Sequence, residues 1–184
     1  MKIKHTCTIK EGKIIRNGQI VLALDIQMPA VEFLPAAYRA MKLDYPKFFK
    51  MDNLCKLAFL AAEVLLQDTP IVQNERNEET GLILFNSVSS LDNDEKFQAS
   101  MAGFPSPSLF VYTLPNLMIG ELCIRYKIYG ENILFVSENH NFEQIMEQVK
   151  IVADETAMRY FICGYVDFYK ENYDASLRFI EVNK

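Results

Sequence analysis

Few side chains in this sequence could serve as nucleophiles. The candidates with the most reactive chemistry are the four cysteines, Cys7, Cys55, Cys123 and Cys163. A cysteine attacks as its thiolate, and nearby positive charge or a helix N-terminus is needed to lower its pKa. Each of these cysteines instead has apolar neighbours in the sequence. We therefore expect reduced thiols that pack in the core, as is usual in a cytoplasmic protein.

General bases are also scarce, because the chain has only two histidines, His5 and His140, at distant positions. If His140 were catalytic, Glu138 is the nearby acid that we would expect to assist it. The serines of residues 87–90 follow an apolar run but lack the G-x-S-x-G pattern of a nucleophile elbow. No two cysteines have C-x-x-C spacing, so we expect no metal site and no cofactor.

The elements that must position these side chains alternate between strand and helix. Apolar runs predict strands at residues 3–9, 14–15, 19–24, 81–85, 133–136, 160–166 and 177–182. Apolar spacing or an acidic first turn predicts helices at residues 52–65, 92–101, 117–126 and 142–157. We expect Asp52 to cap the first of these helices, which should be amphipathic with small residues on its one packing face. Asn17–Gly18 predicts a hairpin turn, and Gly130 predicts the end of the third of these helices. The order predicts one α/β domain over residues 1–184, with a mainly parallel sheet.

Composition excludes several classes of function. Half of the residues are hydrophobic and 23% are charged, which is typical of a folded domain, and the net charge of −5 does not indicate nucleic-acid binding. No apolar run approaches the roughly 18 residues of a membrane span, so we expect a soluble, cytoplasmic protein. Residues 1–56 carry ten Lys and Arg against five Asp and Glu. This basic segment could meet an acidic partner, although solvated lysines are the simpler interpretation.

The most informative segment is residues 105–136, PSPSLFVYTLPNLMIGELCIRYKIYGENILFV. It resembles the segment before the nucleophile in β-ketoacyl synthases, where S/N-P-x-x-F-x-x-T-x-P-N leads into a helix with small residues and an I-R dipeptide. The matching positions are Ser106, Pro107, Phe110, Thr113, Pro115, Asn116, Gly120, Ile124, Arg125 and Gly130. Gly120 would allow another element to approach the helix closely. Residues 51–66 and 81–100 resemble the family's first long helix and its second strand with the following loop.

The resemblance covers roughly residues 50–166 and implies one half of a thiolase-like fold. That half is a five-stranded, mixed, mostly parallel sheet with helices on both faces. Only about ten residues follow Val166 before the last strand, where the family has a long excursion. The family's second half, which carries its catalytic histidines, would be missing.

In the family, the catalytic cysteine follows the third strand at the start of a buried helix, whose dipole stabilises the thiolate. Counting from Gly130, this position falls at His140 or beside it at Asn139, and residues 124–162 contain no cysteine. The resemblance therefore implies that condensing activity is lost. An alternative hypothesis is an acyltransferase or hydrolase that uses His140 and Glu138 on an acyl thioester, although an acyl-imidazole is labile.

The family also pairs its third strands across a two-fold axis. We therefore expect a dimer interface at Asn132, Ile133, Leu134, Phe135 and Val136, in a homodimer or with a complete ketosynthase. The alternative is that the chain itself covers this strand. The resemblance implies a non-catalytic subunit of a fatty-acid or polyketide-type pathway, such as synthesis of an aryl-polyene-like pigment. It would act in assembly, chain-length control or docking of an acyl carrier protein, and a purely structural dimer is the remaining alternative.

Overall fold

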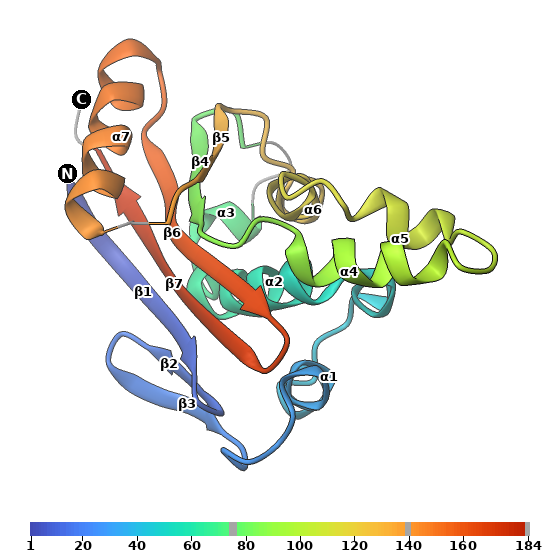
Figure 1. Ribbon diagram of the computed structural model, residues 1–184. Helices are drawn as coiled ribbons and strands as arrows, with labels where there is room; N and C mark the ends of the chain where they lie inside the picture. Colours follow the sequence, from blue (N-terminus) through green and yellow to red (C-terminus); the bar gives the residue numbers. More distant parts are fainter. Residues whose placement is uncertain (74–76, 139–140, 183–184) are drawn as a thin grey trace.

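A computed structural model describes residues 1–73, 77–138 and 141–182 and shows one sheet with helices on both faces (Figure 1). The seven strands of this described part are β1 (Lys2–Lys10), β2 (Lys13–Arg16), β3 (Gln19–Ala23), β4 (Thr80–Asn86), β5 (Asn132–Val136), β6 (Tyr160–Tyr169) and β7 (Asn172–Glu181). The helices are α1 (Ala30–Ala40), α2 (Asn53–Leu66), α3 (Pro70–Gln73), α4 (Leu91–Ser100), α5 (Pro107–Val111), α6 (Leu117–Tyr126), α7 (Phe142–Glu155) and the 3₁₀ helix η1 (Pro46–Lys50). In these described ranges, no helix is long and apolar enough to cross a membrane.

The strands lie in the order β3–β2–β1–β7–β6–β4–β5. β4 pairs in parallel with β5 and β6, whereas every other neighbouring pair is antiparallel. The expected α/β layers and the helices on both faces are confirmed. The expected sheet of five mostly parallel strands is corrected to seven strands within the described residues, of which three are parallel to one another.

Tight turns explain the antiparallel half of the sheet. Glu11–Gly12 and Asn17–Gly18 have φ between 50° and 79°, the left-handed conformation of two-residue hairpin turns. The hairpin predicted at Asn17–Gly18 is therefore confirmed. Lys170, with φ of 55°, begins a third tight turn, between β6 and β7. Residues 167–176 were expected as a connection, but they extend β6 and β7 into paired strands of 10 residues each.

Helix α2 lies at the centre of the larger apolar layer. Asp52 caps it as predicted, because its carboxylate accepts the backbone N–H of Cys55 at 3.0 Å. The prediction of a helix with one apolar face is wrong, since 12 of the 14 residues are buried. The sheet strands β1, β6 and β7 pack on one side of α2, and α1 and α6 flank it on the others.

Helix α7 covers the opposite face of the sheet, where its apolar side packs on β4 and β6. Asn141 begins this helix with a capping box. Its side chain accepts the backbone N–H of Gln144 at 2.9 Å, and the Gln144 side chain accepts the backbone N–H of Asn141 at 3.2 Å. The two reciprocal bonds satisfy donors that a helix start leaves unpaired. They fix the point where the chain leaves the elbow after β5.

The two glycines of the family-like segment behave differently from expectation. Gly130 does not end α6, because Lys127 takes the left-handed C-cap position with φ of 52°. A Cβ atom at Gly130 would instead lie 2.3 Å from the carbonyl oxygen of Thr80 and 2.4 Å from Sδ of Met158. Gly130 therefore lets the chain pass close to the start of β4. The close approach expected at Gly120 is absent within the described residues, since a Cβ atom there would meet nothing within 4 Å.

This contrast gives a matched pair of substitutions. Gly130→Ala should lower the free energy of unfolding by about 2 kcal/mol or more, because the added methyl overlaps backbone that cannot move easily. Gly120→Ala should leave it unchanged or raise it by up to about 1 kcal/mol, the usual gain in a helix. Urea denaturation of the isolated protein measures both. Equal effects of the two substitutions would contradict this packing at Gly130.

Candidate functional site

The position equivalent to the nucleophile lies in the elbow between β5 and α7. Asn139 and His140 fall outside the described residues, and Glu138 beside them is exposed. The elbow begins after β5 and beside the carboxyl end of β4, where the backbone N–H of Ser137 donates to the carbonyl of Asn86 at 2.9 Å. The described part of the elbow is therefore anchored to the end of the parallel strands, the position in which the family resemblance places the nucleophile.

The end of β4 also holds a polar cluster that sequence reasoning missed. The amide and hydroxyl of Ser87 donate to the two carboxylate oxygens of Asp167 at 2.6 and 2.7 Å. The buried side chain of Asn86 donates to the carbonyl of Val166 at 2.8 Å. A serine nucleophile needs a base, usually histidine, and the side chain found on Ser87 is a carboxylate. These contacts fasten β4 to β6. Polar residues at the ends of two buried strands were the sequence feature that could have indicated this cluster.

The cysteines are poor nucleophiles. Burial raises the pKa of Cys7 and Cys163 to about 12 and that of Cys123 to about 11. Burial also raises the pKa of Cys55 well above its ordinary value, and the Asp52 carboxylate adds to the effect. These thiols are protonated at neutral pH, as expected for core side chains. In the described part of the chain, no three His, Cys, Asp or Glu side chains lie close enough to hold a metal ion.

The first half of the family-like segment belongs to an arm, formed by α4, α5 and the loop between them, that projects from the body of the molecule (Figure 1). Ser106 caps α5 by accepting a backbone N–H, and Pro107 is the first residue of that helix. Phe110 packs on Phe97 with ring centroids 5.4 Å apart. The hydroxyl of Thr113 donates to the carbonyl of Phe110 at 2.8 Å. The motif residues therefore hold the shape of the arm.

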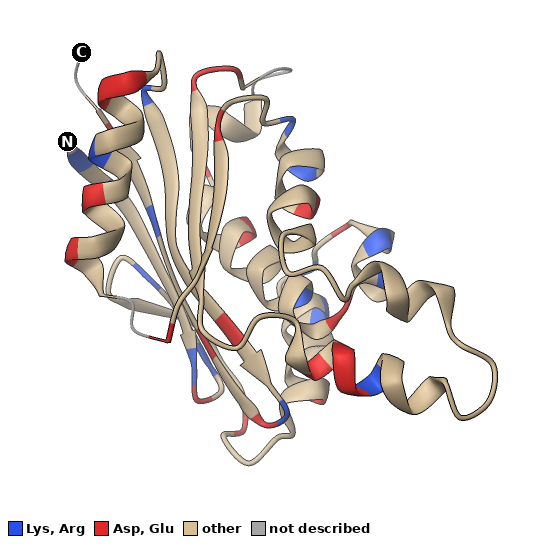
Figure 2. Ribbon diagram, turned by 45° about the horizontal axis from the view of Figure 1, so that its top comes forward, with Lys and Arg blue, Asp and Glu red and all other residues tan. Residues whose placement is uncertain are grey.

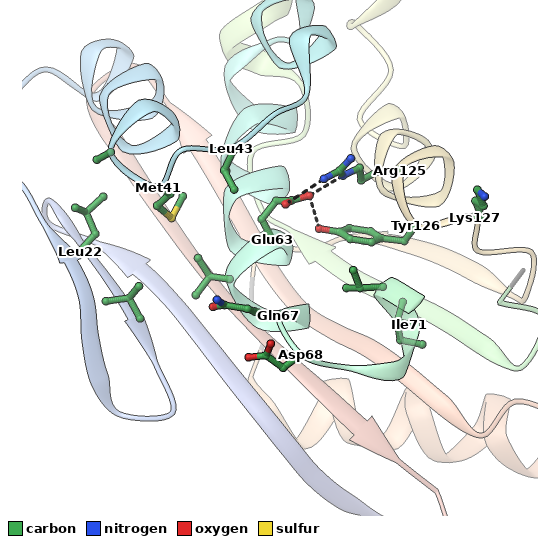
Figure 3. A pocket seen from close by; sticks show the side chains of 14 residues that line it. Leu22, Met41, Leu43, Glu63, Gln67, Asp68, Ile71, Arg125, Tyr126 and Lys127 are labelled. Carbon is green, nitrogen blue, oxygen red and sulfur yellow. Dashed lines mark hydrogen bonds and ion pairs between the residues drawn. The ribbon is translucent and has the colours of Figure 1, made fainter. Parts of the chain in front are cut away.

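The second half of the segment fastens α6 to α2. Pro115 is half-buried and leads into the helix, which the side chain of Asn116 does not cap. Nε and Nη2 of Arg125 donate to the Glu63 carboxylate at 2.7 and 3.3 Å, and the Tyr126 hydroxyl donates to it at 2.8 Å (Figure 3). The hydrogen bond to Glu63 raises the pKa of Arg125, and burial raises that of Tyr126. Both groups therefore remain protonated donors.

A second acid fastens the other side of α6. Glu121 is only 7% exposed, lies 2.7 Å from Nζ of Lys47 and accepts the Tyr112 hydroxyl at 3.0 Å. Burial, followed by the hydrogen bond to Glu121, raises the pKa of Tyr112. Sequence reasoning missed both Glu63 and Glu121, because an acid within an apolar helix is usually a solvent-facing residue.

Strand β5 forms one end of the sheet, and β4 is its sole neighbour among the described strands. Asn132 and Val136 are exposed, while Ile133, Leu134 and Phe135 are half-buried. Phe135 is held in place by stacking on Phe85 of β4, with ring centroids 4.8 Å apart. An edge strand of this kind presents unpaired backbone groups that can pair with another chain.

The arm carries no charge from the last turn of α4 onward, and the uncharged stretch continues into the start of α6. Residues 97–120 contain no Lys, Arg, Asp or Glu, so their ribbon is continuously tan in Figure 2. Large apolar side chains are nevertheless exposed there, including Phe104 (97%), Phe110 (60%) and Leu114 (58%). Contiguous exposed apolar surface of this kind marks interaction sites.

Solved structures share this arrangement of elements. A ketosynthase from Xenorhabdus doucetiae in complex with its chain length factor contains a chain that matches 99% of this one, with 79% of that chain covered, a TM-score of 0.62 and 13% identity. The ishigamide ketosynthase/chain length factor matches 98% of this chain over 61% of its own, with a TM-score of 0.67 and 14% identity. A type II polyketide ketosynthase, bound to a hexaketide and in complex with its acyl carrier protein, matches 97% of this chain over 61% of its own, with a TM-score of 0.68 and 10% identity.

At these identities the likeness establishes the fold, which is the thiolase-like fold of ketosynthases and chain length factors. The expectation drawn from residues 105–136 is confirmed at that level. The chain spans about three fifths of the length of two of these structures and about four fifths of the other. No family model matches the sequence, and no curated protein matches it.

The contact between α6 and α2 can be tested by removing one carboxylate. Glu63→Ala should lower the free energy of unfolding by about 2 kcal/mol, because two donors lose a largely buried charged acceptor. The matched control is Glu79→Ala, since Glu79 forms an exposed pair with Arg159 at 3.5 Å. Exposed pairs contribute less than about 1 kcal/mol. Chemical denaturation measures both variants, and similar losses would contradict the structural role assigned to Glu63.

The thiols can be tested by alkylation. At pH 8, iodoacetamide should label native Cys123 at least about 100-fold more slowly than free cysteine, because a pKa near 11 leaves very little thiolate. A raised pKa means that labelling accelerates as the pH rises, by roughly tenfold per unit between pH 8 and 10. Mass spectrometry locates the label, and denaturant should expose all the thiols. Rapid labelling of one native cysteine would restore that residue as a candidate nucleophile.

Proposed function

We propose that this chain is a non-catalytic, ketosynthase-like subunit that pairs with a complete ketosynthase in a cytoplasmic fatty-acid or polyketide-type pathway. It acts in assembly, chain-length control or docking of an acyl carrier protein. The observation that carries the proposal is the uncharged arm of residues 97–120 with its exposed apolar side chains. Synthesis of an aryl-polyene-like pigment is one such setting.

The edge strand supports pairing with another chain. β5 has one neighbour among the described strands, and its sequence NILFV is apolar enough to be covered. Pairing through β5 would also bring the neighbouring α6 toward the partner. The open space at Gly120 and the exposed Ile124 would then lie at or near the contact.

The lack of a suitable nucleophile supports a non-catalytic role. Residues 124–162 contain no cysteine, and the pKa values of the four cysteines are raised. Exposed apolar side chains of the arm, such as Phe110, could instead limit the space available to an acyl chain held by the partner. The structures with this fold include a ketosynthase with its chain length factor and a ketosynthase with its acyl carrier protein. The basic segment of residues 1–56 offers a surface for an acidic carrier.

Pairing is tested by co-expression with a ketosynthase encoded beside this chain, followed by size-exclusion chromatography. Phe110→Asp and Val136→Asp should each weaken the complex at least about tenfold, because each places a charge on an apolar contact. Both side chains are mostly exposed, and the thermal transition of each isolated variant checks that its fold is kept. The matched control is Ile151→Asp. Ile151 is 48% exposed and lies on α7, which covers the opposite face of the sheet from α2.

The other outcomes separate the alternatives. A homodimer that Val136→Asp dissociates, with no ketosynthase bound, would indicate a purely structural dimer. Turnover of an acyl thioester that is lost in both Glu138→Gln and His140→Ala would favour the acyltransferase or hydrolase. Equal effects of Ile151→Asp and Phe110→Asp would overturn the assignment of the arm as the contact surface.

A further inference from the structure

A groove crosses the molecule on the side of α2 that faces away from the sheet (Figure 3). Its volume is about 620 Å³, within the range of sites that hold small molecules. Its floor is the C-terminal half of α2. One wall comes from β3 and the end of α1, and the other from α3 and the end of α6. It shares no lining residue with β5 or with the described part of the elbow.

The wall on the side of β3 and α1 is apolar. Leu22, Met41 and Leu43 project toward the groove there, and Val64 continues the apolar surface onto the floor. Val21 lies at this rim and is 48% exposed, while Val72 lies at the opposite rim and is 56% exposed. Eight of the 14 lining residues have aliphatic or thioether side chains. An aliphatic chain laid along this wall would remove apolar surface from water on both sides of the contact.

The remaining surface is polar but carries no net charge. Glu63 and Asp68 are balanced by Arg125 and Lys127, and Glu63 is already occupied by its hydrogen bonds from Arg125 and Tyr126. The amide side chain of Gln67 is exposed on the floor between these groups. A charged head group would meet side chains of both signs. A neutral head group with amide donors and acceptors matches this surface better.

We propose that this groove binds an aliphatic acyl chain joined to an uncharged, amide-containing head, the chemistry of an acyl thioester of the pantetheine type. The aliphatic part lies along Leu22, Met41 and Leu43, and the amide part lies over Gln67. The choice of an acyl chain among other aliphatic groups rests on the proposed function. The position is separate from the contact surface of β5 and the arm, so a subunit could hold the ligand before or during pairing.

The test is calorimetric titration of the isolated full chain with the neutral thioester decanoyl-N-acetylcysteamine. We expect saturable binding of one molecule per chain. Val21→Asp and Val72→Asp should each weaken it at least tenfold, because each places a carboxylate where the chain lies. Val31→Asp is the matched control, since Val31 is 48% exposed, like Val21, and lies on α1 outside the groove. The thermal transition of each variant shows that the fold is kept.

Two further probes separate the parts of the ligand. N-acetylcysteamine without the acyl chain should bind too weakly to measure, and decanoate should bind at least tenfold more weakly than the neutral thioester. Equal binding of decanoate would overturn the preference for a neutral head. Absence of saturable binding, or binding unchanged by both groove variants, would overturn the site. Retained pairing with a ketosynthase in that case would leave the proposed function standing, so the two failures are distinguishable.

Discussion

The structure depends on the burial of one helix. α2 is covered on nearly every side, with 12 of its 14 residues buried, and the strands and helices around it pack together only because it fills the space between them. Polar groups on such a helix must find partners inside the protein, since an unpaired buried group costs several kcal/mol. The carboxylate of Asp52 is satisfied by capping the helix, and that of Glu63 by Arg125 and Tyr126.

The Glu63 contact explains why the I-R dipeptide of the family-like segment matters in this chain. The guanidinium of Arg125 holds α6 against α2 and lies over the ring of Tyr45, 4.8 Å from its centroid. Glu121 secures the same helix through Lys47 and Tyr112. With these contacts, α6 is held against the body of the molecule from two sides.

The charge distribution separates two regions of this molecule. The arm is free of charge from residue 97 to residue 120, whereas the groove on α2 has balanced charges beside an apolar wall. An apolar surface without charge suits a protein partner, because no ion must be desolvated when it is covered. A groove with internal ion pairs suits a small neutral ligand. The charge distribution therefore distinguishes the surface proposed for a protein partner from the groove proposed for a small ligand.

Much of the fold could be predicted from the sequence. The cap at Asp52, the hairpin at Asn17–Gly18, the helices beginning near Leu117 and Phe142 and the buried strands β4 and β6 were all found from local patterns. The antiparallel pairing of β1 with β2 and of β6 with β7 was missed, because the turns at Glu11–Gly12 and Lys170–Glu171 carry weak signals. The turn at Lys170 takes its left-handed φ without a glycine.

The sequence by itself determined the class of fold and the absence of cysteine near the elbow, because periodicity and residue identity are local properties of the chain. The tertiary structure alone decided which charges are buried and which glycine is crowded. Glu63 and Gly130 look ordinary in the sequence, and their roles come from Arg125 and Thr80, which are distant along the chain. Which residues contact Glu63 and Gly130 depends on how the whole chain packs, and no local sequence pattern encodes it.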